Sequence, residues 1–389
     1  MAATGDAGRT VLVLGGGIGG VACATRLRRR LPRAHRVVLV EREEHYVYSP
    51  STLWLMVGDR TAAEVRRTRA ALARKGVEIV RGTVEAIDPA GRSVRVDGAT
   101  IHGDFLVVAL GAELAPDAVP GLADAGHDLY SLRGMERLRD ARASFMQGRI
   151  AIVVADLPFK CPAAPNEAAF LLEADLRRRG VRGRCEISLC TPEPGPMPVA
   201  GPEVSGRLRA MIEARGIGYF PGRKLAHVDP GSRELVFADA SRAGYDLLAF
   251  VPPHRAPTVA REAGLLGESG WIAVDRHTLA TRFPGVFAIG DAVGIGLANG
   301  RPLPKAGVLA HAQADVVADN LAFEITGRGA ARAFDGRGAC FIETGDGRAG
   351  FGDGDFFAEP APRVRLRPPG RLLHLGKVLY EKYWLGLWF

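Results

Sequence analysis

Residues 11–20 read VLVLGGGIGG, an apolar run that leads directly into a cluster of glycines. Such a run is typical of a strand buried on both faces, and Gly15, Gly17 and Gly20 fill the frame G-x-G-x-x-G. In that frame the first glycine makes a tight turn, the second lets a pyrophosphate approach the backbone, and the third lets the next helix pack on the strand. The stretch therefore predicts a dinucleotide-binding βαβ fold.

The next predicted strand supplies the acid that this fold uses. Residues 37–40 read VVLV and are followed by Glu41, 21 residues beyond Gly20. A carboxylate at this distance accepts hydrogen bonds from the ribose hydroxyls of a dinucleotide. Because strand, glycines, helix, strand and acid occur in register, a glycine-rich turn of another fold is the weaker interpretation. We also assign Arg42, Ser51 and Val84 to the cofactor site.

Two later segments indicate which dinucleotide is bound. Residues 104–111 read DFLVVALG, a buried strand that ends at Gly111. Residues 281–292 read TRFPGVFAIGDA, in which Gly290 and Asp291 follow another strand and Asp291 would accept a ribityl hydroxyl. With these segments the chain resembles, over nearly all its length, the flavoproteins that have two dinucleotide-binding domains. The resemblance implies FAD, held by a domain that the last third of the chain completes.

The second domain is expected to keep this fold without its glycines. Residues 149–154 form another apolar run, but residues 155–165 read ADLPFKCPAAP, with three prolines, an acid and no glycine. Proline removes amide donors, and the carboxylate of Asp156 repels phosphate. The strand expected at residues 185–190 also lacks a terminal ribose-binding acid. We therefore predict a Rossmann-like domain that does not bind NAD(P), with a helix capped by Asn166.

Composition and charge predict a globular protein with a basic surface. The chain has 389 residues, 47% of them hydrophobic and 24% charged, and its net charge is +8. The arginine clusters lie on predicted helices, so we favour a positive face beside an anionic membrane and expect no nucleic-acid partner. Five cysteines are too few for a disulfide scaffold, and no metal site is predicted. Without an apolar leader or a long apolar stretch, we expect a cytoplasmic protein that associates peripherally with a membrane.

Two cysteine-containing segments narrow the family. Residues 158–167 read PFKCPAAPNE, and residues 338–351 read GACFIETGDGRAGF. They resemble the cysteine segments of the sulfide:quinone oxidoreductases and of the flavin subunit of flavocytochrome c sulfide dehydrogenase. The resemblance implies that Cys161 and Cys340 flank the flavin and form a redox-active disulfide or polysulfur bridge. Lys160 and the adjacent helix N-terminus would favour the thiolate of Cys161.

The remaining cysteines are expected to be structural. Cys23, Cys185 and Cys190 are predicted to be buried small apolar residues. Some members of the resembled family have a third essential cysteine, or one bonded to the flavin. This chain has Arg133 at one such place and no cysteine within residues 46–51, so we expect FAD to be noncovalent.

Two charged residues complete the expected chemistry. The resemblance implies that Cys340 faces the flavin, and that Cys161 carries the persulfide formed when hydrosulfide attacks the bridge. Lys305, before a helix expected at residues 311–321, would stabilise negative charge on the flavin, or is a surface lysine. Glu167 would relay protons, or is an acid favoured at a helix N-terminus.

The C-terminal segment suggests where electrons leave the protein. Residues 371–389 read RLLHLGKVLYEKYWLGLWF, in which aromatic and basic residues are typical of a helix in the membrane interface. The resemblance implies that a membrane quinone enters there. The alternative is a helix docked on the protein core or on a second subunit. Five side chains share the expected apolar face: Leu372, Leu375, Leu379, Tyr383 and Trp384.

These observations predict an α/β protein with two Rossmann-like dinucleotide-binding domains and a membrane-associating tail. The FAD domain is discontinuous, at residues 1–115 and 255–325. The second domain spans residues 116–254, and residues 326–389 supply Cys340 and the membrane contact. The predicted activity is oxidation of sulfide through FAD to a quinone. The alternatives are a type II NADH:quinone dehydrogenase, a flavin subunit that reduces a cytochrome, and a flavin-binding scaffold without turnover; a homo-oligomer is also open.

Overall fold

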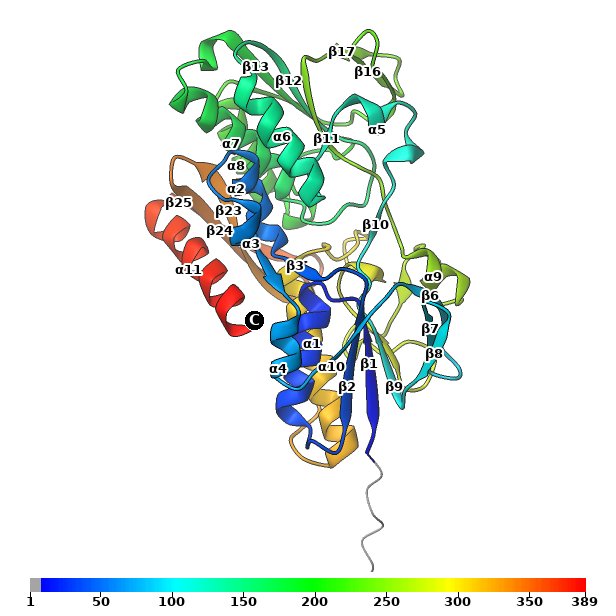
Figure 1. Cartoon of the computed structure of the whole chain (residues 1–389). Coiled ribbons are helices and arrows are strands. Elements are labelled where there is room, and N and C mark those ends of the chain that lie inside the picture. Colours follow the sequence, from blue (N-terminus) through cyan, green and yellow to red (C-terminus); the bar gives the residue numbers. More distant parts are fainter. Residues whose placement is uncertain (1–7) are drawn as a thin grey trace, which may run out of the picture.

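A five-stranded parallel sheet organises the first half of the molecule (Figure 1). The structure is a computed structural model that describes residues 8–389. The start of the chain, where we expect no apolar leader, lies partly outside these residues. The strands lie in the order β21 (Val286–Ala288), β9 (Phe105–Val108), β1 (Thr10–Leu14), β2 (Arg36–Glu41) and β5 (Glu78–Arg81). The last third of the chain thus returns to this sheet through β21, beside β9.

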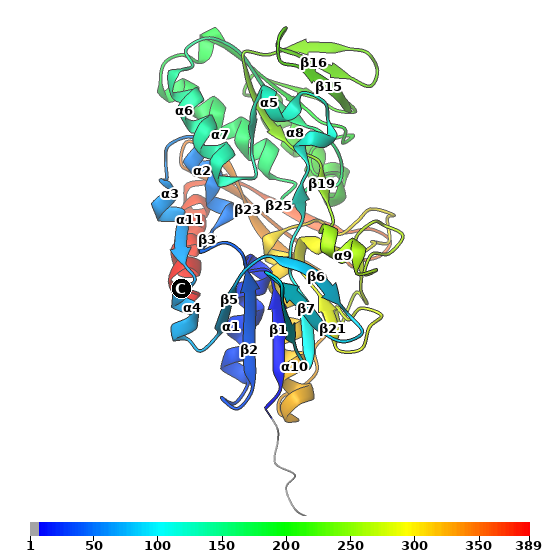
Figure 2. The same cartoon turned by 45° about the vertical axis from the view of Figure 1, so that its right-hand side comes forward.

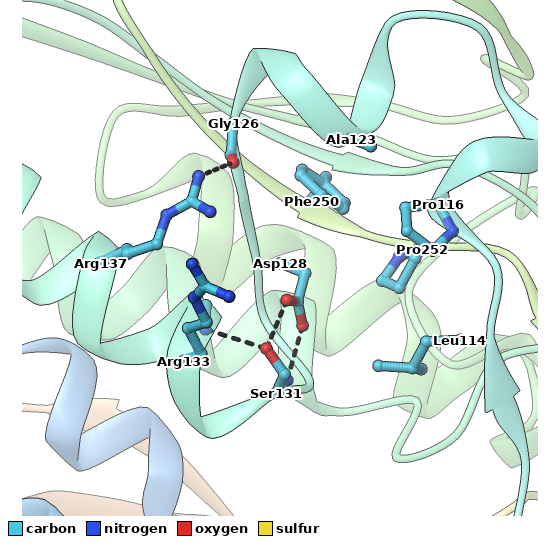
Figure 3. A pocket seen from close by; sticks show the side chains of 11 residues that line it. Leu114, Pro116, Ala123, Gly126, Asp128, Ser131, Arg133, Arg137, Phe250 and Pro252 are labelled. Carbon is cyan, nitrogen blue, oxygen red and sulfur yellow. Dashed lines mark hydrogen bonds between the residues drawn. The ribbon is translucent and has the colours of Figure 1, made fainter.

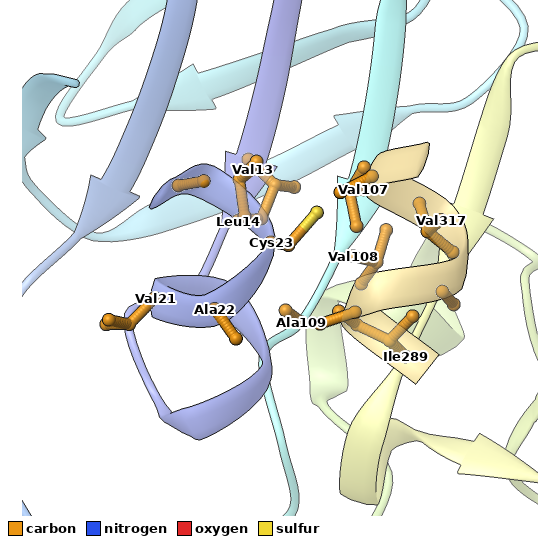
Figure 4. Packing of buried hydrophobic residues seen from close by; sticks show 14 of the residues in the cluster. Val13, Leu14, Val21, Ala22, Cys23, Val107, Val108, Ala109, Ile289 and Val317 are labelled. Atoms are coloured by element: carbon orange, nitrogen blue, oxygen red, sulfur yellow. The ribbon is translucent and has the colours of Figure 1, made fainter. Parts of the chain in front are cut away.

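Two glycines let α1 (Ile18–Arg30) begin immediately after β1. Gly15 has φ +94°, and a Cβ there would lie 2.5 Å from the carbonyl oxygen of Ala109. A Cβ at Gly20 would lie 1.8 Å from the carbonyl oxygen of Gly15. With strand and helix this close, Cys23 is buried among side chains of β1, β9 and α10 (Gly307–Thr326), as Figure 4 shows. The prediction for Cys23 is confirmed.

A second parallel sheet forms the other half of the molecule. Its strands lie in the order β11 (His127–Asp128), β18 (Leu247–Val251), β12 (Gly148–Val154), β13 (Cys185–Cys190) and β14 (Ile217–Phe220). Its main helices are α6 (Leu132–Ser144), α7 (Ala164–Arg178) and α8 (Pro202–Glu213). Between the halves, β10 (Glu113–Leu114) pairs with β19 (His254–Arg255), the latter visible in Figure 2. Cys185 and Cys190 are buried in this half, as predicted.

The start of α7 differs from the sequence-based expectation. Ala163 is the N-cap residue, and Asn166 lies inside the first turn, where its amide donates to the carbonyl of Pro162 at 3.3 Å. The prediction that Asn166 caps the helix is therefore wrong. The physical reason is that Pro165 fits the first helical turn, where a backbone amide donor is not needed, so the helix begins before the asparagine. α10 likewise begins earlier than expected, at Gly307.

The C-terminal segment adds an antiparallel sheet and a long helix. β23 (Arg337–Gly345) and β24 (Arg348–Asp355) form the predicted hairpin, and β25 (Arg363–Gly370) pairs with β24. α11 (Arg371–Leu387) packs along β23 and β24 (Figure 1). Within residues 8–389, no helix has the length and apolarity that crossing a membrane requires.

Short elements connect these parts. The small sheets are β6 (Val84–Asp88) with β7 (Ser93–Val96) and β8 (Ala99–His102); β15 (Leu225–Asp229) with β16 (Glu234–Phe237) and β17 (Arg242–Gly244); β3 (His45–Val47) with β4 (Arg66–Thr68); and β20 (Ile272–Ala273) with β22 (Val293–Gly294). The short helices are α2 (Thr52–Met56), α3 (Ala62–Val65), α4 (Ala70–Arg74), α5 (Leu122–Ala125) and α9 (Thr258–Glu262).

Candidate functional site

The turn between β1 and α1 has the geometry of a dinucleotide cradle. No atom outside the turn lies within 4 Å of a Cβ built at Gly17, so the backbone there faces open space. Glu41, at the end of β2, accepts a hydrogen bond from the amide of Gly16 at 2.6 Å, which places its carboxylate at the turn. Arg69 lies against both, with its guanidinium 3.6 Å from the Glu41 carboxylate and bonded to the carbonyl of Gly16 at 2.9 Å. The sequence did not single out Arg69.

The other predicted cofactor residues lie around the same end of the first sheet, with different degrees of support. The hydroxyl of Ser51 and one carboxylate oxygen of Asp291 are buried and lack a hydrogen-bond partner within residues 8–389. Buried polar atoms without a hydrogen-bond partner are more consistent with a site for a polar ligand than with an apolar core. Gly111 has φ +69° and faces open space. The remaining residues are Val84, half-buried at the start of β6; Gly290, whose amide donates to Gln313 at 2.7 Å; and Arg42, an exposed side chain 3.6 Å from Glu43.

The turn after β12 meets the first half of the molecule at Lys305. The amide of Cys161 donates to the carbonyl of Lys305 at 2.6 Å, and residues 160 and 305 form a parallel bridge. The turn is therefore bonded to the segment that carries Lys305, outside the second sheet. Tyr130, which the sequence did not single out, holds the same turn by donating to the carbonyl of Lys160 at 2.7 Å.

Lys305 is a buried cation rather than a surface lysine. Its ammonium donates to the carbonyls of Asp291 and Val293 at 2.7 and 3.0 Å, and lies 3.3 Å from the centre of the Trp271 ring. Burial lowers the pKa of Lys305 to about 7, opposed by the charge of Asp291. Burial raises the pKa of the Asp291 carboxyl, whereas Lys160 and Lys305 lower it. This lysine is thus poised to be neutral or charged near neutral pH.

Cys161 and Cys340 are distant in sequence, but in the structure the same charged groups, Glu167 and Lys377, act on both thiols. Both are free thiols. Burial raises the pKa of Cys161, and so do the charges of Glu167 and Cys340. Burial raises the pKa of Cys340 to about 11, again with a contribution from Glu167. Its thiol donates to the carbonyl of Phe341 at 3.3 Å, while the residue is open to solvent, so it lies in an accessible recess.

The expected stabilisation of a Cys161 thiolate by Lys160 is wrong. The pKa of Cys161 is raised, because burial and the charge of Glu167 dominate, and the cation that lowers it is Lys377 of α11. The ammonium of Lys160 instead lies 5.6 Å from the centre of the Tyr130 ring. The other half of the expectation holds, because the backbone amide of Ala164, the first residue of α7, lowers the pKa of Cys161. The backbone of Cys161 itself is left-handed, with φ +50°.

A connected set of charged groups links the thiols to α11. Glu167 accepts hydrogen bonds from the amide of Glu343 at 2.7 Å and from the ammonium of Lys377 at 2.9 Å. His374 Nδ1 lies 3.0 Å from a carboxylate oxygen of Glu343. Glu167, Glu343 and Lys377 are buried. We call Glu167, Lys377, Glu343 and His374 the α11 cluster. Sequence reasoning found only Glu167, although Glu343 follows Cys340 by three residues in an otherwise apolar strand.

The faces of α11 are the reverse of those of an ordinary surface helix. The outward face is apolar, with Leu372 84% exposed and Leu375, Leu379 and Tyr383 also exposed. The inward face carries His374, Lys377 and Glu381, and Glu381 pairs with Arg60 at 2.8 Å. Trp384 was expected on the outward face, and this is wrong, because its indole packs inward and donates to the hydroxyl of Tyr46 at 2.9 Å. The helix is therefore docked on the protein and also presents an apolar stripe.

A pocket of about 240 Å³ lies near the junction of the two halves (Figure 3). Arg133 and Arg137 of α6 line one side, and the apolar side chains of Leu114 and Phe250 line the other. Asp128 closes the floor by accepting hydrogen bonds from the amide and hydroxyl of Ser131. Its volume is below the roughly 300–1,000 Å³ of typical small-molecule pockets.

The sequence matches one protein-family model over most of its length. That model, described as pyridine nucleotide-disulphide oxidoreductase, covers residues 9–314. The match includes the glycine turn, both parallel sheets and the start of α10.

Three known proteins extend the similarity to the C-terminal segment. The chain is 29% identical to the mitochondrial sulfide:quinone oxidoreductase of Mus musculus, over 90% of this chain and 79% of the mouse protein. It is 26% identical to the sulfide-quinone reductase of Aquifex aeolicus, over 96% of this chain and 90% of that protein. The X-ray structure of the Aquifex aeolicus sulfide:quinone oxidoreductase superposes with a TM-score of 0.88 at 23% identity, covering 98% of this chain and 91% of the other. At that identity the superposition shows a common fold.

Proposed function

Because the chain belongs to the pyridine nucleotide-disulphide oxidoreductase family, we propose that it oxidises sulfide and passes the electrons through FAD to a membrane quinone. One observation carries the proposal: Glu167 and Lys377, which form an ion pair at 2.9 Å, both act on the pKa of two free thiols that come from distant segments. The relatives named as sulfide:quinone oxidoreductases support the same reading.

The first half of the molecule fits FAD. The backbone at Gly17 is open to a pyrophosphate, and Glu41 stands at the end of β2 for a ribose. The orphaned oxygens of Ser51 and Asp291 offer further polar contacts. We assign Arg42, Val84, Gly111 and Gly290 to the same site. Bound FAD supplies the two-electron acceptor, and Lys305, when protonated, would stabilise negative charge beside it.

The two cysteines receive the substrate. In this proposal they form a disulfide or polysulfur bridge in the resting enzyme, and hydrosulfide attacks it, leaving a persulfide on Cys161 and a thiolate on Cys340. Lys377 stabilises the thiolates, since its charge lowers the pKa of both. Glu167 raises both pKa values and is the nearest carboxylate able to accept a proton from the sulfur.

An anaerobic titration of the purified holoenzyme tests the proposal. Sulfide should bleach the flavin absorbance near about 450 nm, and a soluble quinone should restore it. Cys161→Ser and Cys340→Ser should each slow bleaching by at least about 100-fold, the loss expected when a reacting group is removed. Cys190→Ser, which alters a buried cysteine in the second sheet, is the matched control. Bleaching by NADH and not by sulfide would instead favour a type II NADH dehydrogenase.

The outward face of α11 supports a peripheral contact with an anionic membrane. Beside its apolar stripe, the edge strand β25 carries exposed arginines at every second position: Arg363, Arg365 and Arg367. Arg367 stacks on Phe351, which contacts Phe341, which in turn lies 3.4 Å from a Cβ built at Gly376 of α11. Arginines and apolar stripe thus share one side of the molecule, an arrangement suited to anionic headgroups and acyl chains.

Vesicle sedimentation tests the membrane contact. The protein should sediment with vesicles that contain phosphatidylglycerol and less with pure phosphatidylcholine, because the arginines contribute only with anionic lipid. Leu375→Glu/Leu379→Glu should abolish sedimentation. Phe323→Glu, at an exposed apolar side chain of α10, should not change it. Equal binding of both variants would contradict the assignment of this face.

A further inference from the structure

The α11 cluster forms a continuous chain of proton-carrying groups. Lys377 contacts Glu167 at 2.9 Å and lies 4.0 Å from Glu343, whose other neighbour is His374 Nδ1 at 3.0 Å. Each of these four side chains can give up or accept a proton. Two of the steps are hydrogen-bonded, and the step from Lys377 to Glu343 is an ion pair at 4.0 Å that a small movement of the ammonium would shorten. The chain begins beside Cys161 and Cys340 and ends at His374, whose side chain is 30% exposed.

We propose that the α11 cluster carries the proton released at the two cysteines to solvent at His374. The inference rests on the proposed function. Lys377 and Glu343 would then have a role in turnover beyond holding α11 in place. The Trp54 ring covers the path, with the Lys377 ammonium 4.8 Å from its centre and the His374 ring against it edge-on at 5.8 Å. Water is thereby kept from the middle of the path and admitted at its end.

The charge of the cluster requires a mobile proton. Two carboxylates face one lysine in a buried space, so one negative charge is left over unless a proton sits on Glu343 or His374. Burial raises the pKa of Glu343, while Lys377 and His374 lower it. A leftover buried charge is costly, so the cluster holds one proton readily and can pass it in either direction.

The reaction supplies the proton. Hydrosulfide attacks the bridge, HS⁻ + Cys–S–S–Cys → Cys–S–SH + ⁻S–Cys, which oxidises the incoming sulfur and reduces the bridge by two electrons. The persulfide then ionises, Cys–S–SH → Cys–S–S⁻ + H⁺, and the buried carboxylate of Glu167 is placed to take up this proton. Glu167 accepts this proton. Lys377 receives a proton from Glu167 and transfers one to Glu343, and His374 then releases one to water.

The His374 ring contacts one charged and one uncharged side chain on neighbouring elements. From β23 it meets Glu343, and from α2 it meets only the uncharged ring of Trp54. On its own helix Lys377 points to α7. Arg60 lies over Trp54, 4.6 Å from the ring centre, and is neutralised by Glu381. The His374 side chain thus has one carboxylate partner and is partly exposed to solvent.

Chemical rescue tests the path in the holoenzyme. In dilute buffer, His374→Ala should slow sulfide-dependent flavin bleaching about tenfold, less than the about 100-fold or more for loss of a direct general acid or base. Added imidazole should restore the rate, because a free base can enter the space and take the proton. His277→Ala is the matched control, since His277 Nδ1 is also hydrogen-bonded, to the backbone carbonyl of Phe334, and its ring makes an edge contact with Phe357 at 5.7 Å.

A second readout separates proton transfer from structural damage. Alkylation of reduced Cys161 and Cys340 by iodoacetamide, followed by mass spectrometry across pH, reports the equilibrium thiolate fraction. Because a relay changes a rate and not that equilibrium, His374→Ala should leave the profile within about twofold of wild type. A parallel fall in alkylation and bleaching, an unaltered bleaching rate, or no rescue by imidazole would overturn the proposal. If sulfide fails to bleach the wild-type flavin, the proposed function itself fails.

Discussion

The β1–α1 turn and the β12–α7 turn occupy the same place in two similar halves and do opposite things. Residues 15–17 form the first turn, with Gly15 at φ +94°, and its backbone faces open space. Residues 155–163 form the second, in which Cys161 adopts φ +50° and bonds to Lys305. A left-handed position at a non-glycine residue costs about 1–3 kcal/mol and is typical of functional sites. The comparison teaches that one position in this fold can offer backbone amides to a phosphate or a sulfur to a substrate.

Substitution of Gly20, which packs against the first turn, should have the largest effect on stability. Gly20→Val places a Cβ 1.8 Å from the carbonyl oxygen of Gly15, and backbone cannot yield as a side chain can. We expect loss of more than about 4 kcal/mol of stability, measured by thermal denaturation of the apoprotein or seen as insoluble protein. Gly17→Ala meets no atom within 4 Å. It should leave the apoprotein stable and lower its flavin content; equal damage by both variants would break the comparison.

The stability of the second turn should depend on a buried ion pair and not on close packing of the backbone. Lys377→Met strands the buried carboxylate of Glu167, and loss of one partner of a buried pair costs about 3–5 kcal/mol. Urea denaturation should show this loss, and Glu167→Gln in addition should recover part of it. Lys382→Met, at an exposed lysine of the same helix, should change nothing. If Lys377→Met is as stable as the wild type, the Glu167–Lys377 pair does not support the second turn.

Lys305, whose carbonyl holds the second turn, predicts a pH dependence. Burial lowers its pKa from 10.5 to about 7, so between these values the unfolded chain binds more protons than the folded one. The free energy of unfolding should therefore rise with pH above about 7, by at most about 2 kcal/mol between pH 7.5 and 9. Urea midpoints of the apoprotein measure this rise. Lys305→Met should flatten it, and a slope unaltered in that variant would assign the effect to other groups.

Restoring features of a nucleotide turn should have the smallest effect. Asp156→Gly/Pro158→Gly removes the acid and one proline from the second turn, yet no bleaching of the flavin by NADH should appear. The amide of Cys161 still bonds to Lys305, and β13 still ends at Cys190 without a ribose-binding acid. Rapid reduction by NADH would show that the missing glycine motif alone sets the difference between the turns.

The sequence could predict whatever depends on neighbours along the chain. The strand, glycines and acid from Val11 to Glu41 are local, and so is the hairpin that carries Cys340. The helix cap at Asn166 failed because Pro165 competes for the same turn, a local preference that spacing does not rank.

Contacts between distant segments could not be predicted in this way. The polar face of α11 has partners on other elements, and a spacing of three and four residues at 374, 377 and 381 was visible without indicating what it faced. Trp384 was placed outward because apolar periodicity alone does not distinguish solvent from core. The cation beside the thiols proved to be Lys377 for the same reason, since Lys160 is nearer only along the chain.

The inverted polarity of α11 bears on how the enzyme can be engineered. Deleting α11 would not simply remove exposed apolar surface. Truncation at Gly370 would also delete Lys377, the counter-ion of Glu167, and would expose Glu343. Limited proteolysis in that region should inactivate the thiols. Solubilising changes belong on the outward positions alone, where leucines can be replaced without disturbing any charge beneath them.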